Sequence, residues 1–140
     1  MTEAGGITGM PTRRQQLEQH FNSYIENEIP SLIKQGYNPT IYREMVRARG
    51  SHYAVTIFLL NDPRHTSYGF QRLYDMKRLD ASVEYAASLP WFQELFTDDL
   101  LYEARTRLIT HDFDLDRVLT SEVASPPAWL PSLEESEEGS

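Results

Sequence analysis

Apolar residues recur every three or four positions along much of the chain, which is the spacing of one face of an α-helix. In the first such run they are Leu17, Phe21, Tyr24, Ile25, Leu32 and Ile33. Thr12 and Gln15 have the spacing of a capping box, in which each side chain bonds the other residue's backbone amide. Pro30 lacks an amide hydrogen and crowds the preceding turn, so we expect the helix to kink or restart near Ile29. Gly36 is expected to end it.

The middle of the chain predicts short helices, each with its own start and stop. Asn38 can cap a second helix that Pro39 opens and Gly50 ends. The buried stripe expected for this helix consists of Ile41, Tyr42, Met45 and Val46. The next run, Ala54 to Leu60, is rich in β-branched residues and leaves a buried strand open as an alternative. We favour a helix because Ser51 can cap it and helices flank it.

Further caps mark the later elements. Thr66 or Ser67 can begin a fourth helix, and Asp80 or Ser82 a fifth. An aromatic cluster, expected to be pinned into the core, consists of Trp91, Phe92, Leu95 and Phe96. Thr97 then begins a helix whose first turn carries two acidic residues, Asp98 and Asp99, as the helix dipole favours. A last short helical segment is expected from Leu115, Val118 and Leu119.

These patterns predict an all-α fold, a single compact domain of five to seven short helices over residues 12–120. Residues 1–11 are mostly small and include glycines, so we expect a flexible N-terminus. The composition changes after Thr120. Residues 121–140 are first proline-rich and then acidic, and we interpret them as a tail.

About half of the chain, roughly Gly36 to Leu108, resembles a small uncharacterised bacterial helical domain found alone or attached to larger proteins. The resemblance rests on the order and spacing of Tyr37, Pro39, Met45, Val46, Gly50, Ala54, Leu59, Leu60, Ser67, Gly69, Phe70, Leu73, Arg78, Leu79, Asp80, Ser82, Val83, Glu84, Trp91, Leu95, Phe96 and Thr97, and then of Ala104 to Leu108. It implies no assigned activity.

Composition narrows the class of protein. The 140 residues are 40% hydrophobic and 24% charged, as in a globular domain, and include no cysteine that could form a disulfide or a thiolate site. No apolar run approaches the roughly 18 residues that a membrane-spanning helix needs. The N-terminus lacks the basic and apolar regions of a secretory signal, so we expect a cytoplasmic protein with no membrane partner.

Charge is strongly segregated within a net charge of −8. Residues 34–78 hold eight basic against three acidic side chains, a net of +5, whereas residues 79–140 hold three against fourteen, a net of −11. We predict an anion- or partner-binding patch from Arg43, Arg47, Arg49, Lys77 and Arg78. Its partner could be an acidic protein, another copy of the chain, or nucleic acid. The helices on either side of Gly50 could also form a helix-turn-helix, although a plain hairpin is the simpler interpretation.

No motif points to catalysis, a cofactor or a metal. Asp112, Asp114 and Asp116 alternate as in a calcium loop, but Arg117 replaces the expected glycine and Val123 the expected glutamate. A helix cap explains the same residues more simply. The histidines stand at no ligand spacing, and no glycine-rich phosphate loop or nucleophile elbow is present. We therefore expect neither an enzyme nor a cofactor.

The tail offers a second binding candidate in Trp129 and Leu130, because tryptophan is a favoured interface anchor. Trp129 could equally fold back onto its own domain. The leading hypothesis is a non-enzymatic protein-protein interaction module of the bacterial cytoplasm, binding a partner or itself. The alternative is a DNA- or RNA-binding accessory protein that uses the basic patch.

Overall fold

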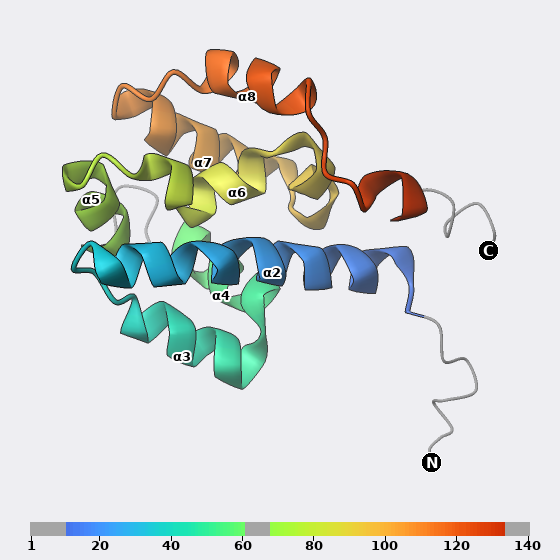
Figure 1. Cartoon of the computed structure of the whole chain (residues 1–140), viewed down its shortest axis with the longest axis horizontal. Helices are drawn as coiled ribbons and strands as arrows, with labels where there is room; N and C mark the ends of the chain where they lie inside the picture. The colour runs from blue at the N-terminus through green and yellow to red at the C-terminus, as the bar shows by residue number, and fades with distance from the viewer. Residues whose placement is uncertain (1–10, 61–67, 134–140) are drawn as a thin grey trace.

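A computed structural model describes residues 11–60 and 68–133 of the chain, and every regular element in those two ranges is a helix (Figure 1). The predicted all-α class is therefore confirmed. The α-helices are α2 (Arg13–Lys34), α3 (Thr40–Arg49), α4 (Ser51–Leu60), α5 (Tyr68–Asp75), α6 (Val83–Ser88), α7 (Asp98–Thr110) and α8 (Leu115–Val123). Two 3₁₀ turns, η1 (Leu79–Ala81) and η2 (Pro90–Leu95), flank α6.

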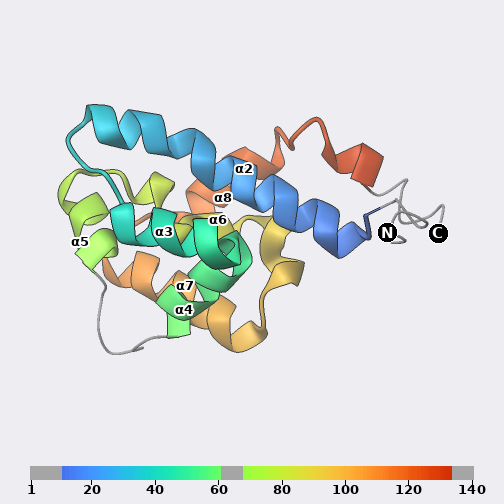
Figure 2. The same cartoon turned by 90° about the horizontal axis from the view of Figure 1, so that it is seen from below.

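The long helix α2 runs along one face of the molecule, and in the view of Figure 1 α3 lies below it and α5 to α8 lie above it. It packs against α4, α6 and η2. The hairpin of α3 and α4 is seen from below in Figure 2. Within this hairpin, α4 is the helix that packs on α7. Helix α7 also packs on α6 and carries α8 on its outer side.

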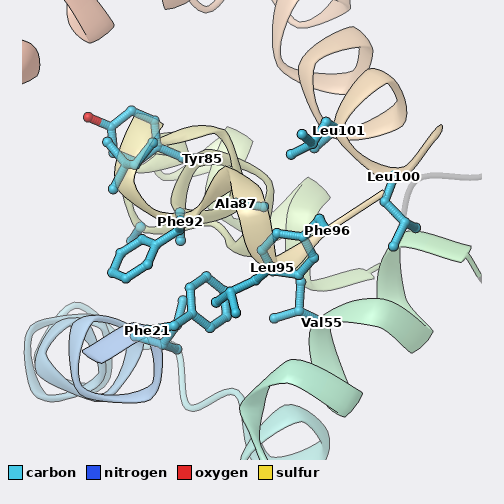
Figure 3. Close-up of a cluster of buried hydrophobic side chains, with 14 of the residues drawn as sticks. Phe21, Val55, Tyr85, Ala87, Phe92, Leu95, Phe96, Leu100 and Leu101 are labelled. Carbon is cyan, nitrogen blue, oxygen red and sulfur yellow. The ribbon is translucent and has the colours of Figure 1, made fainter. Parts of the chain in front are cut away.

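The predicted aromatic cluster lies in the core (Figure 3). Phe21 of α2 meets the edges of Phe92 and Phe96, with ring centroids 5.2 and 5.4 Å apart. Leu95 is buried beside them, while Trp91 is half-buried. These edge-to-face pairs add to the burial of apolar surface and fix η2 against α2.

Local hydrogen bonds begin the helices where the sequence predicts. Thr12 and Gln15 form the complete capping box of α2. Ser82 caps α6, Thr97 caps α7 and Asp114 caps α8, each by accepting a backbone N–H. The predicted caps at Thr66 or Ser67 lie outside the described residues, as do residues 1–10 of the expected flexible N-terminus and the acidic residues 134–140.

Three helix ends share one geometry. Gly36, Lys77 and Asp112 have φ values of 104°, 62° and 63°. After each of them, the next residue's N–H reaches back to a carbonyl five residues earlier, from Tyr37 to Leu32 and, in the same way, after α5 and α7. This is the Schellman arrangement, which favours glycine at the left-handed position. Lys77 and Asp112 take up that position without being glycine.

The cap predicted at Asn38 was wrong, and of the two outcomes expected near Ile29, a kink or a restart, the restart does not occur. The helix α2 does not restart at Pro30 but continues through it to Lys34. Asn38 does not cap α3, because its Oδ1 accepts a hydrogen bond from Arg43 at 3.0 Å and the helix begins at Thr40. The favoured helix over Ala54–Leu60 is confirmed as part of α4. Over the described ranges no helix combines the length and the apolar character needed to cross a membrane.

Candidate functional site on helix α3

Helix α3 lies at the edge of the bundle and buries only one of its residues, Tyr42. The structure corrects the predicted stripe, since Ile41 is not buried but 68% exposed. Adjacent helical residues point about 100° apart, so the register that turns Tyr42 inward turns Ile41 toward the solvent-facing edge. We call the exposed residues Ile41, Glu44, Arg47 and Ala48 the outer face of α3.

Three of the predicted basic residues belong to α3. Arg43 is half-buried and bonded to Asn38, and Arg47 is exposed. The Arg49 guanidinium lies over the ring of Tyr53, 4.2 Å from its centroid. None of the three pairs with a carboxylate in the part of the chain that the structure describes. They can therefore take up an anionic partner without first breaking an internal ion pair.

The other two predicted basic residues are not part of this surface. Lys77 and Arg78 follow α5, and Lys77 borders a pocket with His111 and Asp112 at the end of α7. Arg78 forms ion pairs with Glu28 at 2.9 Å and with Asp80 at 3.2 Å. It also donates to Ser31 and Gln35. Arg78 thus fastens η1 to α2, and the predicted five-residue patch is divided into two parts.

The second helix of the α3–α4 hairpin is not placed like a recognition helix. It packs on both α2 and α7, and Ala54 and Val55 are fully buried. A recognition helix must instead present polar side chains to a nucleic-acid groove. The α3–α4 unit is therefore a plain helical hairpin.

The predicted docking residues of the tail lie on the chain's own domain. Trp129 stacks on His20, with centroids 4.0 Å apart and planes inclined by 6°. Leu130 is half-buried and Leu133 is 1% exposed. In Figure 1 the C-terminal segment runs beside the N-terminal half of α2. These side chains therefore take the alternative arrangement, in which Trp129 folds back onto its own domain.

A buried ion pair is the polar feature that the sequence did not reveal. Glu84 of α6 is 2% exposed and accepts a hydrogen bond from Arg107 of α7 at 2.9 Å. The Arg107 Nε donates to Glu103 at 2.8 Å. Burial raises the pKa of Glu84, and the Arg107 cation opposes that shift. The glutamate between Val83 and Tyr85, in a stretch of apolar and small residues, was the available clue.

Glu84 also borders an apolar cavity of about 70 Å³ between α2, α3, α5 and α6. The cavity walls are largely aliphatic and aromatic, with Tyr42 and Phe70 among them. The described ranges contain no group of three histidine, aspartate or glutamate side chains placed to hold a metal ion. The polar groups that converge within these ranges form ion pairs and helix caps.

Comparison with protein-family models, curated proteins and solved structures finds no match to this chain. The resemblance to a bacterial helical domain therefore stays a prediction.

Proposed function

We propose that this chain is a non-enzymatic protein-protein interaction module of the bacterial cytoplasm that binds a second copy of itself through the outer face of α3. The observation that carries the proposal is the exposure of Ile41 on a helix that also presents Arg47 and Arg49. A large aliphatic side chain gains free energy only where a partner removes it from water. Arginines beside such a side chain are typical of protein interfaces.

The complementary surface lies on α8. Asp116, Leu119, Thr120 and Val123 follow one another at helical spacing and line a shallow groove. We call these four residues the α8 stripe. Val123 is 54% exposed, and the helix belongs to the half of the chain whose net charge is −11. Asp116 and the aliphatic Leu119 and Val123 of the α8 stripe can pair with Arg47 and Ile41 of the outer face of α3 in charge and in apolar character.

The two surfaces lie on opposite sides of the molecule, with α3 and α8 at the two edges of Figure 1. One surface therefore cannot meet the other within a two-fold dimer made by a single contact. Copies would associate head to tail, and such a contact leads to rings or open chains.

Nucleic acid is the less favoured partner. Phosphate binding depends on clustered positive charge. Arg78 is held by Glu28 and Asp80, and Lys77 borders a pocket at the end of α7 and is not part of α3. Glu44 adds a negative charge to the outer face itself, and an exposed Ile41 contributes nothing to a phosphate contact.

Sedimentation velocity over a wide range of protein concentration, at about 50 and 200 mM salt, tests the proposal. The mean mass should rise with concentration and fall with salt. Arg47→Glu, Ile41→Ser and Asp116→Lys should each keep the protein monomeric, and a mixture of the Arg47→Glu and Asp116→Lys proteins should associate again. Lys77→Glu makes the same change of charge outside α3 and is the matched control.

A protein that stays monomeric at every concentration would overturn self-association. Association that survives Arg47→Glu would overturn the role of α3. Labelled duplex and single-stranded DNA should give flat fluorescence anisotropy in the same buffers. Salt-dependent DNA binding that is lost in an Arg43→Glu/Arg47→Glu variant would instead favour the nucleic-acid hypothesis.

A further inference from the structure

A second pocket lies between α2, η2 and the C-terminal segment, on a different surface from α3. Its volume is about 290 Å³, and ten residues line it, among them His20, Tyr24, Trp91, Phe92, Glu122 and Trp129. The pocket exists because the segment after α8 folds back toward α2 (Figure 1). Trp129 and Pro127 then form the wall that faces the helix.

Five aromatic rings, that of His20 included, line this pocket. Trp129 stacks on His20 at 4.0 Å and lies 5.8 Å from Phe92, with an angle of 30° between those two rings. Phe92 in turn meets Tyr24 edge to face at 6.0 Å. Trp91 adds a fifth ring. Rings held in mutual contact keep their orientation, so the pocket is preorganised.

Glu122 is the one acidic or basic side chain other than histidine among these ten residues. Its Oε2 accepts a hydrogen bond from the Tyr85 hydroxyl at 2.8 Å, which fixes the carboxylate at the pocket. Burial lowers the pKa of His20, which favours its neutral ring. The pocket thus combines the rings of Tyr24, Trp91 and Trp129 with a carboxylate, and neither lysine nor arginine lines it.

We propose that this pocket binds an organic cation, an alkylated ammonium group such as a quaternary amine or the end of a lysine side chain. The faces of tryptophan and tyrosine attract such a cation through their quadrupoles, and its methyl or methylene groups pack on the rings. Glu122 supplies the opposite charge. A bare metal cation would need several oxygen ligands, whereas the pocket offers one carboxylate. This proposal does not depend on self-association through α3.

The pocket contains its own reporter, because the two tryptophans of the chain, Trp91 and Trp129, both line it. Intrinsic fluorescence of the full chain should change saturably on titration with choline and with Nε-trimethyl-lysine. The neutral isostere of choline, 3,3-dimethyl-1-butanol, has the same shape without the charge. It should bind at least about tenfold more weakly if a cation–π contact is responsible.

Substitutions identify the groups involved. Glu122→Gln keeps an acceptor for Tyr85 but removes the charge, and should weaken choline binding roughly tenfold, as expected for the loss of a close ion pair. Trp129→Leu should abolish binding while Trp91 still reports the titration. Asp116→Asn removes an exposed charge from the same helix outside the pocket and should leave the affinity unchanged. Arg47→Glu should likewise leave it unchanged, which separates this test from that of the α3 surface.

Equal binding of choline and its neutral isostere would overturn the proposal, because the pocket would then be only apolar. The absence of a saturable change with every cation would overturn it as well. Nα-acetyl-lysine methylamide, in which only the ε-amine is free, distinguishes the source of the ammonium group. Binding of this compound and of trimethyl-lysine without choline would assign the pocket to a protein partner, and binding of choline alone to a small molecule.

Discussion

Glu84 and Arg107 form an ion pair that the protein encloses almost completely, with 2% and 6% of the two residues exposed. Removing two charges from water costs free energy, which their attraction offsets only while both partners are present. Glu103, which also bonds Arg107, has 18% of its side chain exposed and keeps some access to water. Glu84 is therefore the residue whose buried negative charge would be left uncompensated if Arg107 were removed.

Replacing Arg107 with methionine should lower the free energy of unfolding at pH 7 by about 3–5 kcal/mol, because it leaves a buried charge unpaired. Without the cation, the pKa of Glu84 rises further above its ordinary 4.5. Between pH 4.5 and the raised pKa of Glu84, the folded state binds more protons than the unfolded state. The free energy of unfolding therefore falls as pH rises through this range. Urea unfolding should therefore show a smaller loss at pH 5 than at pH 7.

Two variants control that measurement. Arg105→Met removes a half-buried arginine from the same helix and should have little effect. Glu84→Met combined with Arg107→Met removes both charges and should recover most of the lost stability. A double variant no more stable than Arg107→Met alone would show that lost packing, and not the unpaired carboxylate, is responsible.

At the scale of single elements, α2 tolerates a proline in its interior because of where that proline points. Pro30 is exposed, and so is Glu26, whose carbonyl lacks the usual amide partner four residues later. Water can satisfy that carbonyl, and the contacts of Ile25, Ile29 and Leu32 with the core keep the helix continuous. The stability of α2 thus comes mainly from its packed face.

Pro30→Ala should raise the free energy of unfolding by about 1–3 kcal/mol, because it restores one hydrogen bond and removes the clash with the preceding turn. The measurement is chemical unfolding followed by circular dichroism. Gln19→Ala, an exposed position of the same helix, should change stability by less than about 0.5 kcal/mol. A loss of stability in Pro30→Ala would mean that the proline limits the unfolded chain more than it strains the helix.

The elements show which features a sequence can predict. The capping box of Thr12 and the caps at Ser82 and Thr97 were predictable because they depend on residues three positions apart. The exposure of Ile41 was not, since its neighbour Tyr42 is buried by contacts that only the assembled bundle provides. Periodicity gives the helix but leaves its rotation to tertiary packing.

The candidate sites follow the same rule at the scale of the whole molecule. Charge counting found the arginines of α3, which are neighbours in sequence. It could not foresee that Arg78 would turn to Glu28, fifty residues earlier, and leave the predicted patch. Nor could it place Glu122 among the aromatic rings of α2 and η2, because that pocket is made by parts of the chain about a hundred residues apart.

The extent of the folded unit is also decided at this scale. The domain end at residue 120 stays a prediction; α8 continues to Val123, and Trp129 in the segment after it packs on α2. Leu133 is 1% exposed, within a helical turn over residues 130–133. Its side chain therefore belongs to the core, and Trp129 covers His20 and Phe92.

If this segment is part of the fold, Leu133→Ala in the full chain should lower the free energy of unfolding by about 2–4 kcal/mol, as for a buried leucine elsewhere. Its exposed neighbour gives the control, and Ser132→Ala should change stability by less than about 0.5 kcal/mol. Urea unfolding followed by tryptophan emission measures both, since Trp129 loses its stacked environment when the segment detaches. Equal stability of the two variants would show that packing of this segment adds nothing measurable to the free energy of unfolding. The pocket that the segment closes would then lose one of its walls.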